Sequence, residues 1–351
     1  MQAATSPESS LAEREEASVP RNLAPQLLVV VDTEEEFDWS APFDSSARSV
    51  EAMEDIGLFQ HLCDEVGIRP TYVIDHPVAS QERGRRLIGE FASEGRAVIG
   101  AHLHPWVSPP FEEQVTSASS YPGNLPADLE ARKLETLTTT IEENFSRRPT
   151  IYKAGRYGFG PHTTALLEDL GYTIDLSACP AFDFTADGGP DWSRWSAAPY
   201  WFGADRHLLG LPTTGAFVGW LSRAGASVHR AASRPPLSWA HSGALLSRSG
   251  ALERLMLSPE GYRHAHHRRL TESLLARGVR IFSFSLHSPS LRPGCTPYVR
   301  SQAQLERFIR SCRQYFEWFL ETLGGEATTP EELRERLVTT RTPPPPPPAP
   351  A

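Results

Sequence analysis

The chain has 351 residues, of which 40% are hydrophobic and 22% are charged, and its formal net charge is -9. This composition is typical of a globular protein with a sizeable core, and the negative charge disfavours nucleic acid as a partner. No apolar run reaches the roughly 18 residues that a membrane-spanning helix requires. The start, MQAATSPESSLAEREEASVP, has no basic segment followed by an apolar one, so we expect no secretory signal and a cytoplasmic protein.

The two ends of the chain differ in composition from the region between them. Residues 1–24 are rich in Ala, Ser and Glu without apolar periodicity, and we predict that they form a disordered leader. The segment 326–351 ends in TRTPPPPPPAPA, which favours an extended polyproline conformation because proline disrupts helices and sheet ladders. The four cysteines show no paired spacing, so we expect free thiols.

Between these ends, residues 25–325 alternate between strand-like and helix-like patterns. The strand-like runs, in chain order, are QLLVVVD, TYVIDH, RAVIGAHLH, TIYKAG, YTIDLS, HLLGLPTT and VRIFSFSLH. Helical spacing of apolar residues occurs between them, for example over 127–146 and 301–325. Alternating strands and helices favour a parallel sheet, and about seven strands predict an α/β fold with a distorted (β/α) barrel. The segment 215–260, with Trp220, Trp239 and His241, breaks this rhythm and predicts a partly helical insertion.

Four groups of polar residues follow the ends of strand-like runs. They are Asp32 with the glutamates at 34–36, His102 with His104, Arg156, and His287. The C-terminal ends of parallel strands meet at one mouth of a barrel, where active sites form. The sequence therefore predicts that these side chains converge at one site.

His102 and His104 are separated by a single residue, and alternate residues of extended backbone point to the same side. Both imidazoles could bind one metal ion, and a carboxylate from the 32–36 run would complete a three-ligand site with a position left for water. The structural alternative is two histidines that are exposed or hydrogen bonded. Asp32 directly follows an apolar run and needs a partner for its charge, and Arg156 is a candidate for that partner.

Taken together, the motifs resemble the polysaccharide deacetylase (NodB-homology, carbohydrate esterase family four) superfamily over about residues 25–325. VVDTEEEFDW is similar to the first motif, GAHLHPW to the histidine motif, KAGRYGFGP to the arginine motif and FSLHSPSL to the last motif. Five sequence segments are similar to those of a bacterial WalW-type branch that is found among surface-polysaccharide genes. They are DTEEEFDWS, GAHLHPWV, YKAGRYG, ADGGPDW and HSPSLRPG.

The sequence departs from the usual family pattern at two places. Thr33 follows Asp32 where the family has two adjacent aspartates, which favours Glu34 as the metal ligand and leaves Glu35 as an alternative. The usual His-x-x-x-His motif is shortened here, so the geometry of the two histidine ligands is expected to differ.

The resemblance implies a metal-dependent hydrolase that removes N-acetyl groups from a sugar of a surface polysaccharide or its precursor. The implied metal is divalent, with zinc expected, and its implied ligands are Glu34, His102 and His104. The implied catalytic residues are Asp32 as the base, Arg156 as the residue that orients it, and His287 as the acid. Around the substrate we expect Tyr157 to assist at the oxyanion through its backbone, Asp175 to orient an imidazole, and Trp192 to wall the acetyl pocket.

Three alternatives remain open. Two histidines and one carboxylate also form the facial triad of non-haem iron oxygenases, although those usually have all-β folds. A hydrolase of another C–N bond could use the same barrel. A non-catalytic carbohydrate-binding pseudoenzyme could keep the barrel without the reaction.

Overall fold

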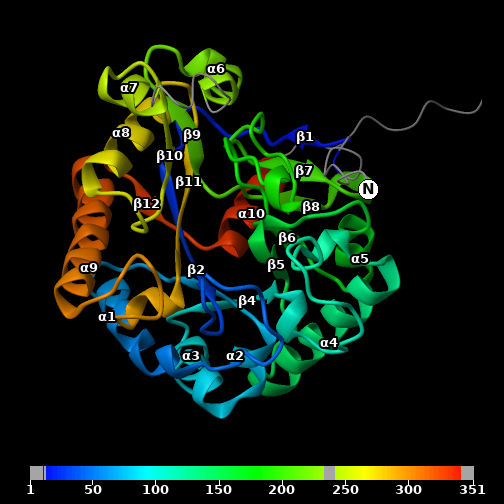
Figure 1. The fold of residues 1–351 in the computed structure, drawn as a ribbon. Coiled ribbons are helices and arrows are strands. Elements are labelled where there is room, and N and C mark those ends of the chain that lie inside the picture. Colours follow the sequence, from blue (N-terminus) through cyan, green and yellow to red (C-terminus); the bar gives the residue numbers. More distant parts are fainter. Residues whose placement is uncertain (1–10, 12, 233–241, 341–351) are drawn as a thin grey trace, which may run out of the picture.

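The computed structural model describes residues 11, 13–232 and 242–340, and within them the main sheet curls into an incomplete barrel (Figure 1). Parallel strands run side by side in the order β11-β2-β3-β4-β5-β6-β8, which confirms the α/β barrel and the seven predicted strands. Their bounds are β2 Gln26–Thr33, β3 Thr71–Ile74, β4 Val98–Leu103, β5 Ile151–Ala154, β6 Ile174–Asp175, β8 Leu208–Gly210 and β11 Ile281–His287.

The barrel does not close. On one side, β7 pairs antiparallel with β8 and β1 pairs antiparallel with β7, so β1 and β11 are the opposite edges of the sheet. The short β12 pairs with β2, and β9 and β10 form a separate antiparallel pair. The bounds of these strands are β1 Glu15–Glu16, β7 Tyr200–Phe202, β9 Gly215–Val218, β10 Glu253–Met256 and β12 Glu326–Ala327.

Several helices, among them α1, α3, α4 and α9, cover the outside of the curled sheet, while α6 and α7 belong to the segment 215–260 (Figure 1). Their bounds are α1 Ile56–Glu65, α2 His76–Ser80, α3 Glu82–Ser93, α4 Ala127–Phe145, α5 Thr163–Asp169, α6 Gly225–Ala232, α7 Ser242–Arg248, α8 His264–Leu275, α9 Gln302–Glu317 and α10 Pro330–Thr340. Among the described helices, none combines the length and the apolar character needed to cross a membrane.

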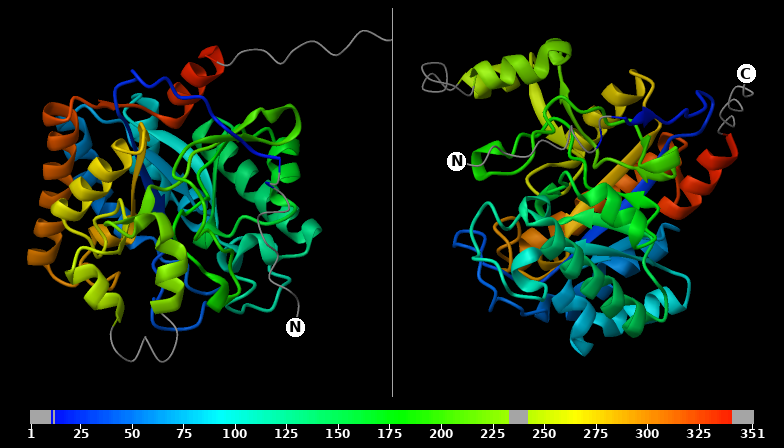
Figure 2. Two further views of the ribbon diagram at one scale, coloured as in Figure 1. Left: turned by 90° about the horizontal axis from the view of Figure 1, so that it is seen from above. Right: turned by 90° about the vertical axis from the view of Figure 1, so that its right-hand side faces the viewer.

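The alternation of side chains along β2 divides the core into two parts. Leu28 and Val30 point into the barrel, where they belong to a cluster with Leu333 of α10. Leu27 and Val29 belong to the larger cluster that includes the covering helices. Glu331 of α10 accepts a hydrogen bond from Thr150, directly before β5, so α10 covers the N-terminal ends of the strands. In Figure 2, α10 is the red helix at one end of the barrel. The C-terminal ends of the strands lie at the other end, where the candidate site is found.

Two predicted boundaries are wrong. The segment 1–24 is not disordered throughout, because β1 pairs with β7 and Ala17 is buried; residues 1–10 lie outside the described part of the chain. The barrel unit extends past residue 325, because β12 and α10 complete it. The segment 215–260 contains β9, α6, α7 and β10, whereas Trp239 and His241 lie outside the described residues.

Candidate active site

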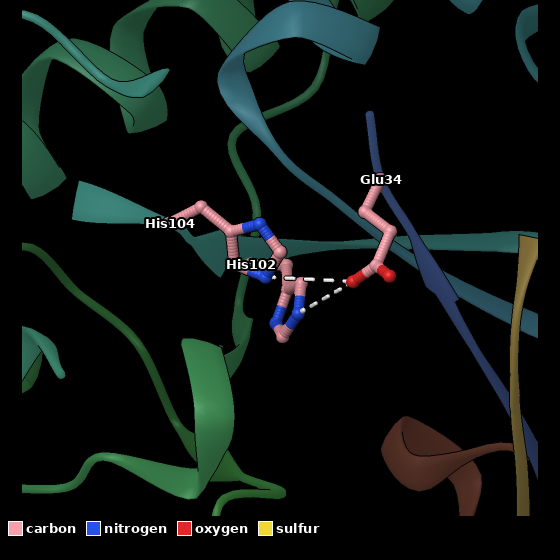
Figure 3. A group of neighbouring side chains, drawn as sticks. All are labelled: Glu34, His102 and His104. Carbon is pink, nitrogen blue, oxygen red and sulfur yellow. Dashed lines mark ion pairs between the residues drawn. The ribbon is translucent and has the colours of Figure 1, made fainter. Parts of the chain in front are cut away.

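The side chains of Glu34, His102 and His104 converge at the C-terminal mouth of the barrel (Figure 3). Glu34 Oε2 lies 3.7 Å from His102 Nε2 and 3.4 Å from His104 Nε2. All three side chains are buried, and the Oε1 atom of Glu34 has no hydrogen-bond partner among the described residues. Strand alternation produces this grouping, because 102 and 104 leave β4 on the same side, as do 32 and 34 on β2.

The Nδ1 atom of each imidazole has a hydrogen-bond partner on the side away from Glu34. His102 Nδ1 lies 3.0 Å from the carbonyl oxygen of Lys153, and His104 Nδ1 lies 3.0 Å from Glu35 Oε2. These contacts favour the tautomers that carry the proton on Nδ1, which leaves both Nε2 lone pairs facing Glu34.

Glu35 is already fully engaged on the far side of His104. Besides contacting His104, its carboxylate accepts a hydrogen bond from Trp106 Nε1 at 2.8 Å, and its backbone N–H donates to Asp75 at 2.8 Å. Glu35 therefore positions His104, and Glu34 is the carboxylate that faces both Nε2 atoms.

The electrostatics of this group fit a cation. Burial lowers the pKa of His104 to about 4 and also lowers the pKa of His102, so both rings are neutral, which is the form that binds metals. Burial raises the pKa of Glu34 to about 7, although His287 and His102 oppose the shift. Two neutral imidazoles and a carboxylate whose second oxygen is free form a donor set suited to a divalent metal such as zinc.

Asp32 lies beside this group and is paired with a buried lysine. Lys153 Nζ lies 2.6 Å from Oδ1 and 2.7 Å from Oδ2 of Asp32. Burial would raise the pKa of Asp32, but Lys153, His102 and His287 outweigh it and hold the pKa below its usual value. Lys153 was not among the residues predicted from the sequence, although a lysine in an apolar strand, two residues after the inward-facing Ile151, signals a buried charge that needs a partner.

His287 approaches Asp32 from the neighbouring strand. The two are register partners in the β11–β2 pair, and His287 Nε2 lies 3.7 Å from Asp32 Oδ2. On its other side, His287 Nδ1 lies 2.6 Å from Oε2 of Glu260, and Oε1 of the same carboxylate accepts a hydrogen bond from Ser290. Burial alone would lower the pKa of His287, but the negative charges of Glu260, Glu34 and Asp32 outweigh this effect and raise the pKa to about 10.

Glu260 is a second site residue that was not predicted from the sequence. It follows β10 at the end of the insertion, and no local pattern there indicates a functional carboxylate. Only the folded chain brings it to His287.

Comparisons with solved structures agree with this architecture. A protein from Mycobacterium smegmatis assigned as a polysaccharide deacetylase has a TM-score of 0.53 at 16% identity, with 96% of this chain and 98% of that chain covered. The PuuE allantoinase also has a TM-score of 0.53, at 14% identity, with 90% of this chain and 91% of that chain covered. The chain has the polysaccharide deacetylase fold. No family model and no curated protein matches the sequence, and the WalW-type branch stays a prediction.

Within this deacetylase fold, Arg156 does not orient Asp32 as predicted. It lies in the turn η4 (Gly155–Tyr157) directly after β5, with a positive φ of 53°. Its guanidinium donates to the hydroxyl of Ser120 at 2.6 Å and lies 3.4 Å from Asp187 Oδ2. Arg156 therefore lines the edge of the site, and Lys153 holds the position next to Asp32.

Of the three residues expected around the substrate, only Tyr157 lines the cavity. Its carbonyl accepts a hydrogen bond from Trp192 Nε1 at 3.1 Å, so Trp192 supports Tyr157 from outside the cavity rather than forming its wall. Asp175 contacts Ser177 and no imidazole. Because Ile174 faces the barrel interior, its neighbour Asp175 points to the outer face.

The site opens into a cavity of about 650 Å³ whose lining is rich in aromatic residues. The aromatic residues that line it are Phe37, Trp39, Phe43, Trp106, Tyr157, Phe182, Phe184, Tyr262 and Tyr298. The ring of Trp39 meets His287 edge-on at a centroid distance of 5.2 Å, and Trp106 stacks on His104 at 4.3 Å. A ligand in this cavity would therefore contact apolar walls. Charged groups would meet it only at the base of the cavity and at the edge formed by Arg156.

Proposed function

We propose that the protein is a metal-dependent amide hydrolase that removes N-acetyl groups from a sugar of a surface polysaccharide or its precursor. The observation that carries this proposal is the placement of two differently tuned groups beside one donor set. Asp32, held ionised by Lys153, interacts with His102 of that set, and His287, held protonated by Glu260, interacts with Glu34.

Glu34, His102 and His104 would hold the divalent metal, for which zinc is expected. When bound, such a metal lowers the pKa of a coordinated water and polarises a carbonyl. Asp32 takes the proton from the attacking water, because Lys153 keeps its carboxylate ionised. His287 donates a proton to the leaving nitrogen, because Glu260 and its other acidic neighbours keep the imidazole protonated at neutral pH.

The aromatic cavity supports a sugar substrate. Pyranose rings have apolar faces that pack on aromatic side chains, and small-molecule sites combine such walls with a few placed polar groups. The polysaccharide deacetylase neighbour supports the N-acetyl group as the target. A location in the cytoplasm is a further part of the same proposal.

Hydrolysis of a different C–N bond is the second candidate, because the allantoinase matches the fold with the same TM-score. The two candidates share the metal site and the proton donor and differ in substrate. Acetate release from N-acetylated sugars and consumption of allantoin, measured on the same preparation, separate them.

The deciding experiment measures zinc content together with acetate release from N-acetylglucosamine oligomers. The full-length chain is compared with His102→Ala/His104→Ala and with a control variant, His61→Ala/His162→Ala, that removes two exposed histidines. We expect about one zinc per chain and acetate release in the wild type and the control, and loss of both in the site variant. Zinc without turnover of either substrate class would favour a pseudoenzyme, and zinc content unchanged in the site variant would refute the metal site.

A further inference from the structure

A second cavity, of about 1120 Å³, lies where the barrel fails to close. On one side it is lined by residues 16–21 and 193–199, which flank the β1–β7 edge of the sheet. On the other side it is lined by the start of β9 and by the turn that joins α8 to β11, residues 276–280. No described residue lines both this seam cavity and the active-site cavity, so the seam cavity is a separate compartment.

The seam cavity is strongly basic although the chain carries a formal net charge of -9. One acidic side chain, Glu16, lines it. Five arginines line it: Arg21, Arg194, Arg223, Arg277 and Arg280. Such a local excess of positive charge in an acidic protein attracts anions.

Three of these guanidinium groups are available to a ligand. The side chains of Arg21, Arg194 and Arg223 form no hydrogen bond or ion pair within the described part of the chain, whereas most arginines elsewhere pair with a carboxylate. Arg277 is partly used, because it donates to the carbonyl of Phe217 at 2.8 Å, and Arg280 Nε donates to the carbonyl of Arg21 at 3.3 Å.

The start of α6 adds to the positive potential. The first turn, Gly225–Ser227, and the preceding turn η7 (Ser222–Ala224) line the cavity. Backbone N–H groups at the start of a helix, together with the helix dipole, favour negative charge. The hydroxyls of Ser222 and Ser227 line the same wall and can donate hydrogen bonds.

We propose that the seam cavity binds a phosphorylated small molecule that carries at least two negative charges. Arg21, Arg194 and Arg223 come from three separate segments, so their guanidinium groups can approach a ligand from different sides. A tetrahedral phosphoryl group presents three oxygens to such a set, whereas a planar carboxylate presents two. The volume leaves room for a second phosphoryl group or an attached ring.

The test is a calorimetric titration of the full-length protein with inorganic pyrophosphate. The site variant is Arg194→Ala/Arg223→Ala, and the matched control is Arg307→Ala/Arg310→Ala, which removes the same charge from exposed positions of α9. We expect binding at one site, weakened about tenfold or more in the site variant because two charge-assisted contacts are lost, and unchanged in the control. Equal weakening in both variants would reduce the effect to overall charge and overturn the proposal.

Two further measurements separate binding in the seam cavity from binding elsewhere. Pyrophosphate that bound the active-site metal would bind Arg194→Ala/Arg223→Ala as tightly as the wild type, and that result also overturns the proposal. The variant His102→Ala/His104→Ala is expected to keep its affinity, so the seam site can stand even where the proposed hydrolase function fails. Co-sedimentation with vesicles of phosphatidylcholine and phosphatidic acid, without binding of soluble pyrophosphate, would contradict a small-molecule ligand.

Discussion

Lys153 Nζ contacts both carboxylate oxygens of Asp32, at 2.6 and 2.7 Å, and both side chains are buried inside the barrel. The lysine reaches from β5 to β2 across the mouth, and its neighbour in register on β4 is His102. Lys153 therefore holds the proposed base, Asp32, through its ammonium group and one of the expected metal ligands, His102, through its backbone carbonyl.

Replacing this lysine tests its role directly. We expect Lys153→Met to reduce kcat for acetate release by at least about a hundredfold, since Asp32 loses the charge that keeps it ionised. The buried carboxylate left behind should also lower the free energy of unfolding by roughly 3–5 kcal/mol. Urea unfolding and steady-state kinetics measure the two effects.

Arg156→Met is the matched comparison for Lys153→Met. Because Arg156 contacts Ser120 and Asp187 and not Asp32, we expect it to change KM more than kcat. A larger loss of kcat in Arg156→Met than in Lys153→Met would contradict the pairing of Lys153 with Asp32.

The pair formed by His104 and Glu35 supports a second prediction. Glu35→Gln keeps all three expected ligands but weakens the hydrogen bond that orients His104, so zinc affinity should fall about 10- to 100-fold. Competition with a fluorescent zinc chelator measures the affinity. Glu36→Gln, which changes the next glutamate of the same run, serves as the control and should bind zinc as the wild type does, and a wild-type affinity in Glu35→Gln would remove the positioning role.

Much of this site was predictable because it depends on local alternation. The spacing of two residues places Glu34 with Asp32 at the end of β2, and His104 with His102 at the end of β4, on the inner side of the barrel, with β3 between the two strands. The same rule, applied to β6, would have excluded Asp175, since Ile174 is the inward residue there. The prediction for Asp175 failed because it considered only the position of the residue at the end of a strand and not the direction of its side chain.

The remaining errors have a different cause. Arg156 follows β5 in a turn with positive φ, and such a change of backbone direction redirects the side chain in a way that strand periodicity does not describe. Glu260 reaches His287 only because β10 and β9 fold beside β11, so its role depends on tertiary structure. Trp192 was expected to wall the acetyl pocket, but it does not line the cavity and donates a hydrogen bond to the carbonyl of Tyr157 instead.

Because Glu260 raises the pKa of His287, we expect it to determine the pH dependence of the proposed reaction. The carboxylate raises the pKa of His287, so removing its charge in Glu260→Gln lowers that pKa from about 10. An acid acts only while it is protonated, and the alkaline limb of the pH profile of kcat should move to lower pH. Glu260→Asp should restore part of the shift, and Glu253→Gln, on the same insertion, should cause none. An unmoved alkaline limb in Glu260→Gln would exclude His287 as the acid.

From the buried carboxyl group of Asp175 we predict that the free energy of unfolding depends on pH independently of the active site. Burial raises its pKa from 3.8 to about 7, although Ser177 opposes the shift, and its Oδ2 atom has no hydrogen-bond partner among the described residues. The folded state therefore holds a proton that the unfolded state releases between about pH 4 and pH 7. The stability from this group is fully present below about pH 4 and is lost as the pH rises through about 7.

Asp175→Asn removes this titration, so the free energy of unfolding should depend less on pH in the variant. One pKa unit is worth about 1.4 kcal/mol, so the wild type should lose up to roughly 4 kcal/mol relative to the variant across this range. Urea unfolding at several pH values between 4 and 8 measures the difference. Asp169→Asn, at the exposed end of α5, is the control and should keep the wild-type slope. Parallel curves for Asp175→Asn and the wild type would show that Asp175 is solvated in the folded protein, and would remove the argument that it points into the packed layer outside the barrel.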